Sequence, residues 1–170
     1  RFIQSEELGF ATQSKFIVAV QLLADYDLSF DICILHHQLA DVLELVKACP
    51  KNLFVLDHVG KPGINDGLTK PWMQQMKELS SYENVSCKLS GMVTEADWAN
   101  WTQENLEPYI KHVIDCVGID RLMYGSDWPV QRLAASYEQW VEILLRATRD
   151  LSSRDRDKLF WENAKALYRI

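Results

Sequence analysis

The chain has 170 residues, of which 48% are hydrophobic, so it is long enough to bury the core of one domain. A net charge of -6 and the lack of a Lys/Arg cluster argue against nucleic-acid binding. No apolar run approaches the roughly 20 residues that span a bilayer, so a membrane partner is not expected. Widely spaced cysteines without a CxxC pair fit reduced, buried thiols and a cytoplasmic location.

Helical and strand patterns alternate along the chain. Residues 12–26 place apolar side chains on one helical face, and residues 30–35 form a run rich in Ile and Phe, as in a buried strand. The alternation continues to the end of the chain and predicts parallel crossover units. Strands are predicted at 30–35, 53–58, 85–90 and 122–126, and helices at 12–26, 39–48, 72–79, 106–117, 134–149 and 154–168.

The first residues, Arg1 to Gln4, show neither an initiator Met nor a signal segment, and we interpret them as the end of a further strand that begins upstream. Five strands could form an open sheet, but this start favours the second half of an eight-stranded barrel. No Gly-rich phosphate loop follows any strand, which argues against nucleotide-binding folds. Residues 1–170 are therefore expected to form a single domain that starts within a barrel.

Two predicted strands end in polar residues. Asp57 and His58 follow the apolar run that starts at Leu53, and Asp127 follows the run from Leu122 through Gly125. Because parallel strands collect chemistry at their carboxyl ends, His58 and Asp127 are predicted to share one site. The alternative is that each residue merely starts a turn or caps a strand.

Lys88 and a histidine pair are further candidates. Strand alternation puts Lys88 on the face opposite the apolar residues of 85–90, inside a barrel, where an ammonium needs a carboxylate or a bound anion. An exposed edge strand would place Lys88 in solvent instead. His36 and His37 end another strand on opposite faces, so one of them should face the site, and we favour His37.

Three segments, at 56–62 (LDHVGKP), 87–98 (CKLSGMVTEADW) and 123–129 (MYGSDWP), resemble the sugar-lactonase branch of the amidohydrolase superfamily. This branch includes hydrolases of the L-fuconolactone and L-rhamnonolactone type and, more distantly, pyrone-dicarboxylate lactonases. The closing segment at 160–168 is similar to the C-terminal helix of that family. The motifs occur in the family's order, and the likeness runs over most of the chain.

The resemblance implies an α/β fold, the C-terminal portion of a (β/α)8 TIM barrel with parallel strands alternating with helices. His58 would end strand six, Asp127 strand eight, His37 strand five, and Arg1 to Gln4 would end strand four. The family carries a His-x-His pair on its first strand. This chain has no such pair, and roughly three and a half βα units would precede its first residue.

The resemblance also implies a lactone hydrolase of carbohydrate metabolism. Asp127 would take a proton from the attacking water, and His58 would polarise the carbonyl directly or through a metal. A metal would be zinc or manganese, bound by His58, Asp127 and His37, although some relatives are expected to work without one. Hydrogen bonds and stacking to a sugar lactone would come from Lys88, Glu95, Trp98, Trp128, His37 and Trp101, unless the tryptophans simply pack the long loop.

Two other functions stay open. The superfamily also includes metal-dependent decarboxylases of aromatic acids, which would need a bound metal and an apolar, ring-sized pocket. The chain could also be a truncated half barrel without catalysis, at most a structural or binding module. The expected partner is a small molecule, and a homo-oligomer is possible.

Overall fold

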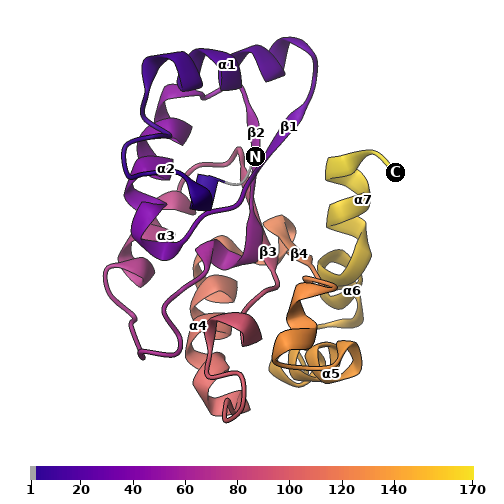
Figure 1. Ribbon diagram of the computed structural model, residues 1–170. Helices are drawn as coiled ribbons and strands as arrows, with labels where there is room; N and C mark the ends of the chain where they lie inside the picture. Colours follow the sequence, from indigo (N-terminus) through magenta and orange to yellow (C-terminus); the bar gives the residue numbers. More distant parts are fainter. Residues whose placement is uncertain (1–2) are drawn as a thin grey trace.

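The computed structural model describes residues 3–170 and contains a sheet of four strands in the order β1-β2-β3-β4 (Figure 1). Each adjacent pair is parallel, with Phe30 opposite Phe54, Leu56 opposite Cys87, and Cys87 opposite Leu122. This order confirms the predicted alternation of parallel strands and helices. The strands are β1 (Ser29–Ile32), β2 (Leu53–Leu56), β3 (Val85–Leu89) and β4 (Leu122–Tyr124).

The helices lie around this sheet. The helix α1 (Ser14–Asp25) precedes β1, and α2 (Leu39–Ala48), α3 (Trp72–Leu79) and α4 (Gln103–Val117) connect the successive strands. After β4 come α5 (Tyr137–Ala147), α6 (Ser153–Asp157) and α7 (Asn163–Tyr168), with a π-helical turn between the last two. Figure 1 shows α1, α2 and α3 on the side of β1 and β2, and α5 to α7 grouped beyond β4.

The two faces of the sheet differ as the sequence pattern predicts. In β3, Val85, Cys87 and Leu89 are buried, while Ser86 and Lys88 between them are partly exposed. The apolar set packs against the helices, because burial of apolar surface is what holds a strand to its covering helix. The predicted stripe of α2 is buried too, at Leu39, Val42, Leu43 and Val46.

Several predicted ends are wrong by a few residues. The strand predicted at 53–58 ends at Leu56, because Asp57–Gly60 form a tight turn, and the strand predicted at 122–126 ends at Tyr124. Helix α5 starts only at Tyr137, because the Ser136 hydroxyl accepts from the Gln139 N–H and caps it. The predicted helix at 154–168 is divided by the π-helical turn.

The predicted strand end at Arg1 to Gln4 is only partly covered by the described residues. Residues 1 and 2 lie outside the described residues, and Ile3–Ser5 form a 3-10 turn. The Gln4 N–H donates to the Cys33 carbonyl at 3.0 Å, so this turn lies beside the carboxyl end of β1. Ile3 and Gln4 therefore belong to a turn and not to the predicted strand end.

The loops after the four strands meet at the carboxyl edge of the sheet. They hold 3-10 turns at His36–Gln38, Asp57–Gly60 and Val93–Glu95, and the loop that leaves β4 at Gly125. The Trp140 indole N–H on α5 donates to the Gly125 carbonyl at 2.7 Å and fixes that loop. This edge is where the predicted site residues should lie.

Two further predictions concern membrane-spanning segments and the state of the cysteines. Within the part of the chain that the structure describes, none of the helices has the length and apolar character needed to cross a membrane. Cys33, Cys49, Cys87 and Cys116 are all free, and the first three are buried, as the lack of a CxxC pair predicts.

Candidate active site

The structure brings His58 and Asp127 together at the carboxyl edge of the sheet. The His58 Nε2 atom lies 3.5 Å from Asp127 Oδ1, and the two side chains are only 18% and 10% exposed. Their strands, β2 and β4, are separated by β3, so only the curvature of the parallel sheet and the loops bring the side chains into contact. The result is a buried imidazole-carboxylate pair.

The backbone around this pair is strained. His58 (φ 53°), Val59 (φ 48°), Lys61 (φ 48°) and Asp127 (φ 56°) all have left-handed conformations. A positive φ is rare for residues other than glycine, and it is least expected of a β-branched valine. Such conformations cost about 1–3 kcal/mol each and persist where tertiary contacts enforce them, which is common at functional sites. These backbone conformations direct the His58 and Asp127 side chains toward each other.

The end of β3 supports the His58 ring. The Ser90 Oγ atom lies 2.8 Å from His58 Nδ1, which leaves Nε2 as the nitrogen that faces Asp127. The next residue, Gly91, lies so close that an added Cβ would come within 2.7–2.8 Å of the imidazole. Gly125 similarly leaves room for Ser90, whose Cβ would be 2.8 Å from a Cβ at that position. Both glycines are therefore required for this packing.

Burial shifts the titration of both members of the pair. Desolvation lowers the pKa of His58, against the opposing effect of the Asp127 and Asp57 carboxylates. Desolvation raises the pKa of Asp127, against the lowering effect of His58 and Lys61. The two pKa values move toward each other, which reduces the cost of proton transfer within the site.

The Lys88 ammonium lies between two carboxylates, those of Asp31 and Asp57. Its Nζ atom donates to Asp31 Oδ2 at 2.6 Å and lies 2.8 Å from Asp57 Oδ1. A buried ammonium needs a carboxylate or an anion nearby, and two carboxylates surround this one. The predicted role of Lys88 in substrate binding competes with these protein partners.

Glu95 lies beside Lys61 at the rim of the site. Its Oε1 atom is 4.0 Å from Lys61 Nζ, and the same ammonium donates to Gln4 Oε1 at 2.7 Å. Burial raises the pKa of Glu95, although Lys61 acts to lower it. The neighbouring Thr94 Oγ1 lies 3.5 Å from Asp127 Oδ2, so the turn that carries Glu95 contacts the catalytic candidate directly.

Two of the candidate tryptophans are placed to stack on a substrate, and the third packs the long loop. Trp98 and Trp128 are 53% and 64% exposed, so their ring faces are free for stacking. The Trp98 indole N–H donates to the Thr94 carbonyl at 2.8 Å, which fixes it to the same rim. Trp101 is partly buried and donates to the Ala134 carbonyl at 2.8 Å, so it packs the long loop against the segment before α5.

The two histidines after β1 differ in their surroundings. His37 is exposed on the turn after β1, whereas the neighbouring His36 contacts Lys61. The His36 Nδ1 atom lies 3.2 Å from the Lys61 carbonyl, and its ring lowers the pKa of Glu95. The turn that starts at His36 rotates the two rings away from the simple alternation of a strand, so His36 is the better candidate of the pair.

Sequence analysis did not single out four of the residues that build this site. Ser90 and Gly91 follow β3, so the rule used for the other strand ends could have found them. Lys61 lies inside the recognised segment at 56–62, but nothing in its pattern shows that the chain turns back there. Cys33 directly follows β1, and its apolar neighbours in sequence predict only a buried core thiol.

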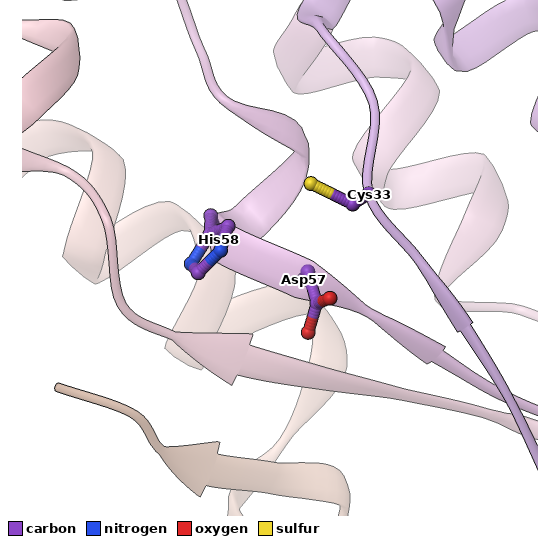
Figure 2. A group of neighbouring side chains, drawn as sticks. All are labelled: Cys33, Asp57 and His58. Carbon is purple, nitrogen blue, oxygen red and sulfur yellow. The ribbon is translucent and has the colours of Figure 1, made fainter. Parts of the chain in front are cut away.

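Cys33 belongs to a group of donors that could hold a metal. Within the described residues, the ligand atoms of Cys33, Asp57 and His58 all lie within 4.8 Å of one another. Figure 2 shows that they come from the end of β1 and the turn after β2, with the thiol directed toward that turn. Thiol, carboxylate and imidazole donors suit zinc. Asp57 is already paired with Lys88, however, and burial raises the pKa of the Cys33 thiol.

The His58–Asp127 pair also fits a divalent cation. Their separation of 3.5 Å exceeds that of an ordinary hydrogen bond. It is close to the ~3.4 Å between two donors on a tetrahedral zinc with bonds of about 2.1 Å. The predicted third ligand, His37, is not part of either group. His58 is the donor common to both.

A prediction follows for Glu95. Its pKa is raised above the ordinary 4.5, so the native state binds this proton more tightly than the unfolded state does. Stability is therefore lost as the pH rises from 4.5 through the folded-state pKa. We expect Glu95→Gln to raise the Tm at pH 7.5, and the gain to disappear near pH 4.5. Thermal denaturation at both pH values checks this, with the exposed Glu83→Gln as control, and an unchanged Tm at pH 7.5 would contradict it.

Comparison with known proteins identifies the class to which this fold and site belong. The profile of the amidohydrolase family matches residues 12–170, so the chain belongs to the amidohydrolase family, as its motifs indicate. It is 33% identical to the L-fucono-1,5-lactonase of Burkholderia multivorans, over 98% of this chain and 60% of that protein. It is 36% identical to the L-fucono-1,5-lactonase of Burkholderia ambifaria, over 89% of this chain and 53% of that protein.

The solved structures agree. A crystal structure of an amidohydrolase from Burkholderia multivorans with bound zinc matches all of this chain and 63% of its own, with a TM-score of 0.95 and 33% identity. This confirms the expected portion of a (β/α)8 barrel. A dihydroxybenzoic acid decarboxylase from Polaromonas with bound manganese matches at a TM-score of 0.61 and 15% identity, which shows the fold alone. The chain spans about 60% of the length of the curated relative from Burkholderia multivorans.

Proposed function

We propose that this protein is a hydrolase that opens a small sugar lactone by attack of water, with Asp127 as the general base. The observation that carries the proposal is the buried His58–Asp127 pair, held by left-handed backbone at the carboxyl edge of the parallel sheet. The names of the L-fucono-1,5-lactonase relatives support a lactone as the substrate.

In the proposed reaction, a water molecule beside Asp127 attacks the lactone carbonyl carbon while its proton passes to the carboxylate. The ring C–O bond then breaks, and the leaving alkoxide takes the proton back from Asp127. The product is the open hydroxy acid. The raised pKa of Asp127 suits both steps, because the carboxylate must accept a proton and then release it.

His58 would stabilise the negative charge that develops on the carbonyl oxygen. If the Ser90 hydroxyl donates to Nδ1, then Nε2 carries the proton and can donate it to that oxygen. If Nδ1–H donates to Ser90, then Nε2 keeps a lone pair that faces Asp127 and can hold a metal. The tautomer that Ser90 selects therefore decides between the two modes.

A divalent metal, when bound, would polarise the carbonyl and lower the pKa of the water. We propose His58 and Asp127 as its holders. Cys33 lies near His58 and is a further donor, whereas Asp57 already pairs with Lys88. The zinc in the related crystal structure supports zinc over manganese. The steps assigned to Asp127 stay the same with or without it.

Residues at the rim of the site would bind the substrate. Glu95 and Lys61 offer an acceptor and a donor for sugar hydroxyls, and the exposed rings of Trp98 and Trp128 offer apolar faces for stacking on the sugar ring. A decarboxylase of aromatic acids would need an apolar pocket for its ring, and these polar rim groups do not favour it. His37 and Trp101 stay outside this proposal.

The test is a lactonase assay of the folded protein. A panel of five- and six-membered aldonolactones, L-fucono-1,5-lactone among them, is offered with added zinc, with manganese and with a chelator. We expect hydrolysis well above the buffer rate for at least one of them. A folded protein that hydrolyses none under any of these conditions contradicts the proposal, and release of CO2 from a dihydroxybenzoate with manganese would favour the decarboxylase.

A further inference from the structure

A second group of polar side chains surrounds Lys88, next to the site, and takes no part in the proposed reaction. Lys88 on β3 contacts Asp31 on β1 and Asp57 after β2, as described above. The Tyr168 hydroxyl, at the end of α7, donates to Asp31 Oδ2 at 2.7 Å. The Lys88 ammonium also lies 5.3 Å from the centroid of the Tyr168 ring, in cation-π range. We call Asp31, Asp57, Lys88 and Tyr168 the lysine network.

The lysine network joins α7 to β1. Tyr168 and Asp31 are separated by 137 residues, and α7 stands beyond β4 while β1 is the opposite edge strand of the sheet (Figure 1). The Tyr168 side chain thus links the C-terminal helix to β1. Lys88, at the middle of this arrangement, contacts every other member.

One member of the network leads directly into the site. Asp57 is the first residue of the turn in which His58 and Val59 have left-handed backbone. That turn closes when the Lys61 N–H donates to the His58 carbonyl at 2.8 Å. A strained turn needs fixed points, because its conformation is otherwise higher in energy than the relaxed alternatives. The ion pair between Lys88 and the Asp57 carboxylate fixes the first residue of the turn.

We infer that Lys88 and Tyr168 are positioning residues, which hold Asp57 and thereby keep the His58 imidazole in register with Asp127. The inference rests on the proposed function for its kinetic consequences, but its geometry stands on the contacts alone. It departs from the predicted role of Lys88 in binding substrate, because two carboxylates and a tyrosine ring already surround the ammonium.

The charges in the network support this role. Burial by itself would lower the pKa of Lys88, but hydrogen bonds to Asp31 and Asp57 outweigh burial and raise it. The amine is therefore a charged ammonium at every pH at which the protein would work. Burial also raises the pKa of Tyr168 to about 12, so its hydroxyl keeps the proton that it donates to Asp31.

The test compares two changes at the C-terminus. Tyr168→Phe removes the hydroxyl from the network, whereas Arg169→Gln removes the neighbouring exposed ion pair with Asp27. Both weaken the attachment of α7 to the start of the chain, but only the first touches the network. We expect Tyr168→Phe to lower kcat about 10- to 100-fold with little change in KM, as for a misplaced catalytic group, and Arg169→Gln to keep the wild-type kcat.

Hydrogen exchange gives a readout that does not depend on activity. We expect the Lys61 amide, which closes the turn at His58, to exchange faster in Tyr168→Phe than in Arg169→Gln. Lys88→Met should have the same effect more strongly, and Lys88→Arg should restore most of the protection and of kcat. If the wild type hydrolyses no lactone, the proposed function fails and exchange alone decides about positioning. Equal exchange at Lys61 in all variants would overturn the inference.

Discussion

Asp127→Asn is expected to lower kcat by about 10²–10⁴, the usual range when general acid–base help is lost. Asparagine has the same shape as aspartate and tolerates the left-handed backbone that this position adopts, at φ 56°. The fold should therefore survive, with an unchanged circular dichroism spectrum. What is lost is the carboxylate that accepts the proton of the water.

The measurement is kcat on the best lactone from the panel, for wild type, Asp127→Asn and the exposed Asp66→Asn. The control changes the same functional group on the loop that follows the His58 turn, so it reports any general effect of removing a negative charge from this end of the protein. A folded Asp127→Asn protein with near-normal turnover would remove Asp127 from the reaction and leave the proposed mechanism without a base.

Gly91→Ala is expected to lower activity strongly although it removes none of the proposed catalytic side chains. A Cβ at this position would come within 2.7–2.8 Å of the His58 Cγ, Cβ and Nδ1 atoms, so the imidazole must move. A displacement of about 1 Å can cost on the order of 10²-fold in rate. Overpacking should also destabilise the fold by about 1–3 kcal/mol.

Gly67→Ala is the matched control for this change. Gly67 has a similar φ of 63°, but no atom lies within 4 Å of the Cβ that alanine would add. Both variants therefore carry the backbone cost of a left-handed alanine, about 1–2 kcal/mol, and only Gly91→Ala carries the clash. Urea denaturation and kcat are measured for both. Equal losses in the two variants would show that the contact with His58 is unimportant.

The alternation of apolar runs was sufficient to predict the sheet. The strands β1 to β4 are short, and the helices that connect them, α2, α3 and α4, each bury apolar residues, so local patterns and the parallel rule together define the strand order. The same reasoning identified His58 and Asp127, because polar residues directly after apolar strands are conspicuous in sequence. The exact ends were less predictable, since turns such as Asp57–Gly60 depend on contacts with other strands.

Two features show the limit of strand alternation. It extended the second strand to His58, but the chain leaves the strand at Leu56 and the left-handed turn sets the direction of the ring. It also favoured His37 over His36, and the turn that begins at His36 brings the other ring to Lys61. Period-two reasoning holds only while the backbone stays extended.

The sequence by itself determined the class of fold, the family, and which residue types stand at the strand ends, because these follow from local periodicity and from motifs of adjacent residues. Only the tertiary structure decided which of those side chains meet. The pairing of His58 with Asp127, the support from Ser90 and Gly91, and the enclosure of Lys88 join residues between 31 and 137 positions apart. Contacts over such separations depend on how the sheet curves and how strained turns are held, and no local pattern encodes either.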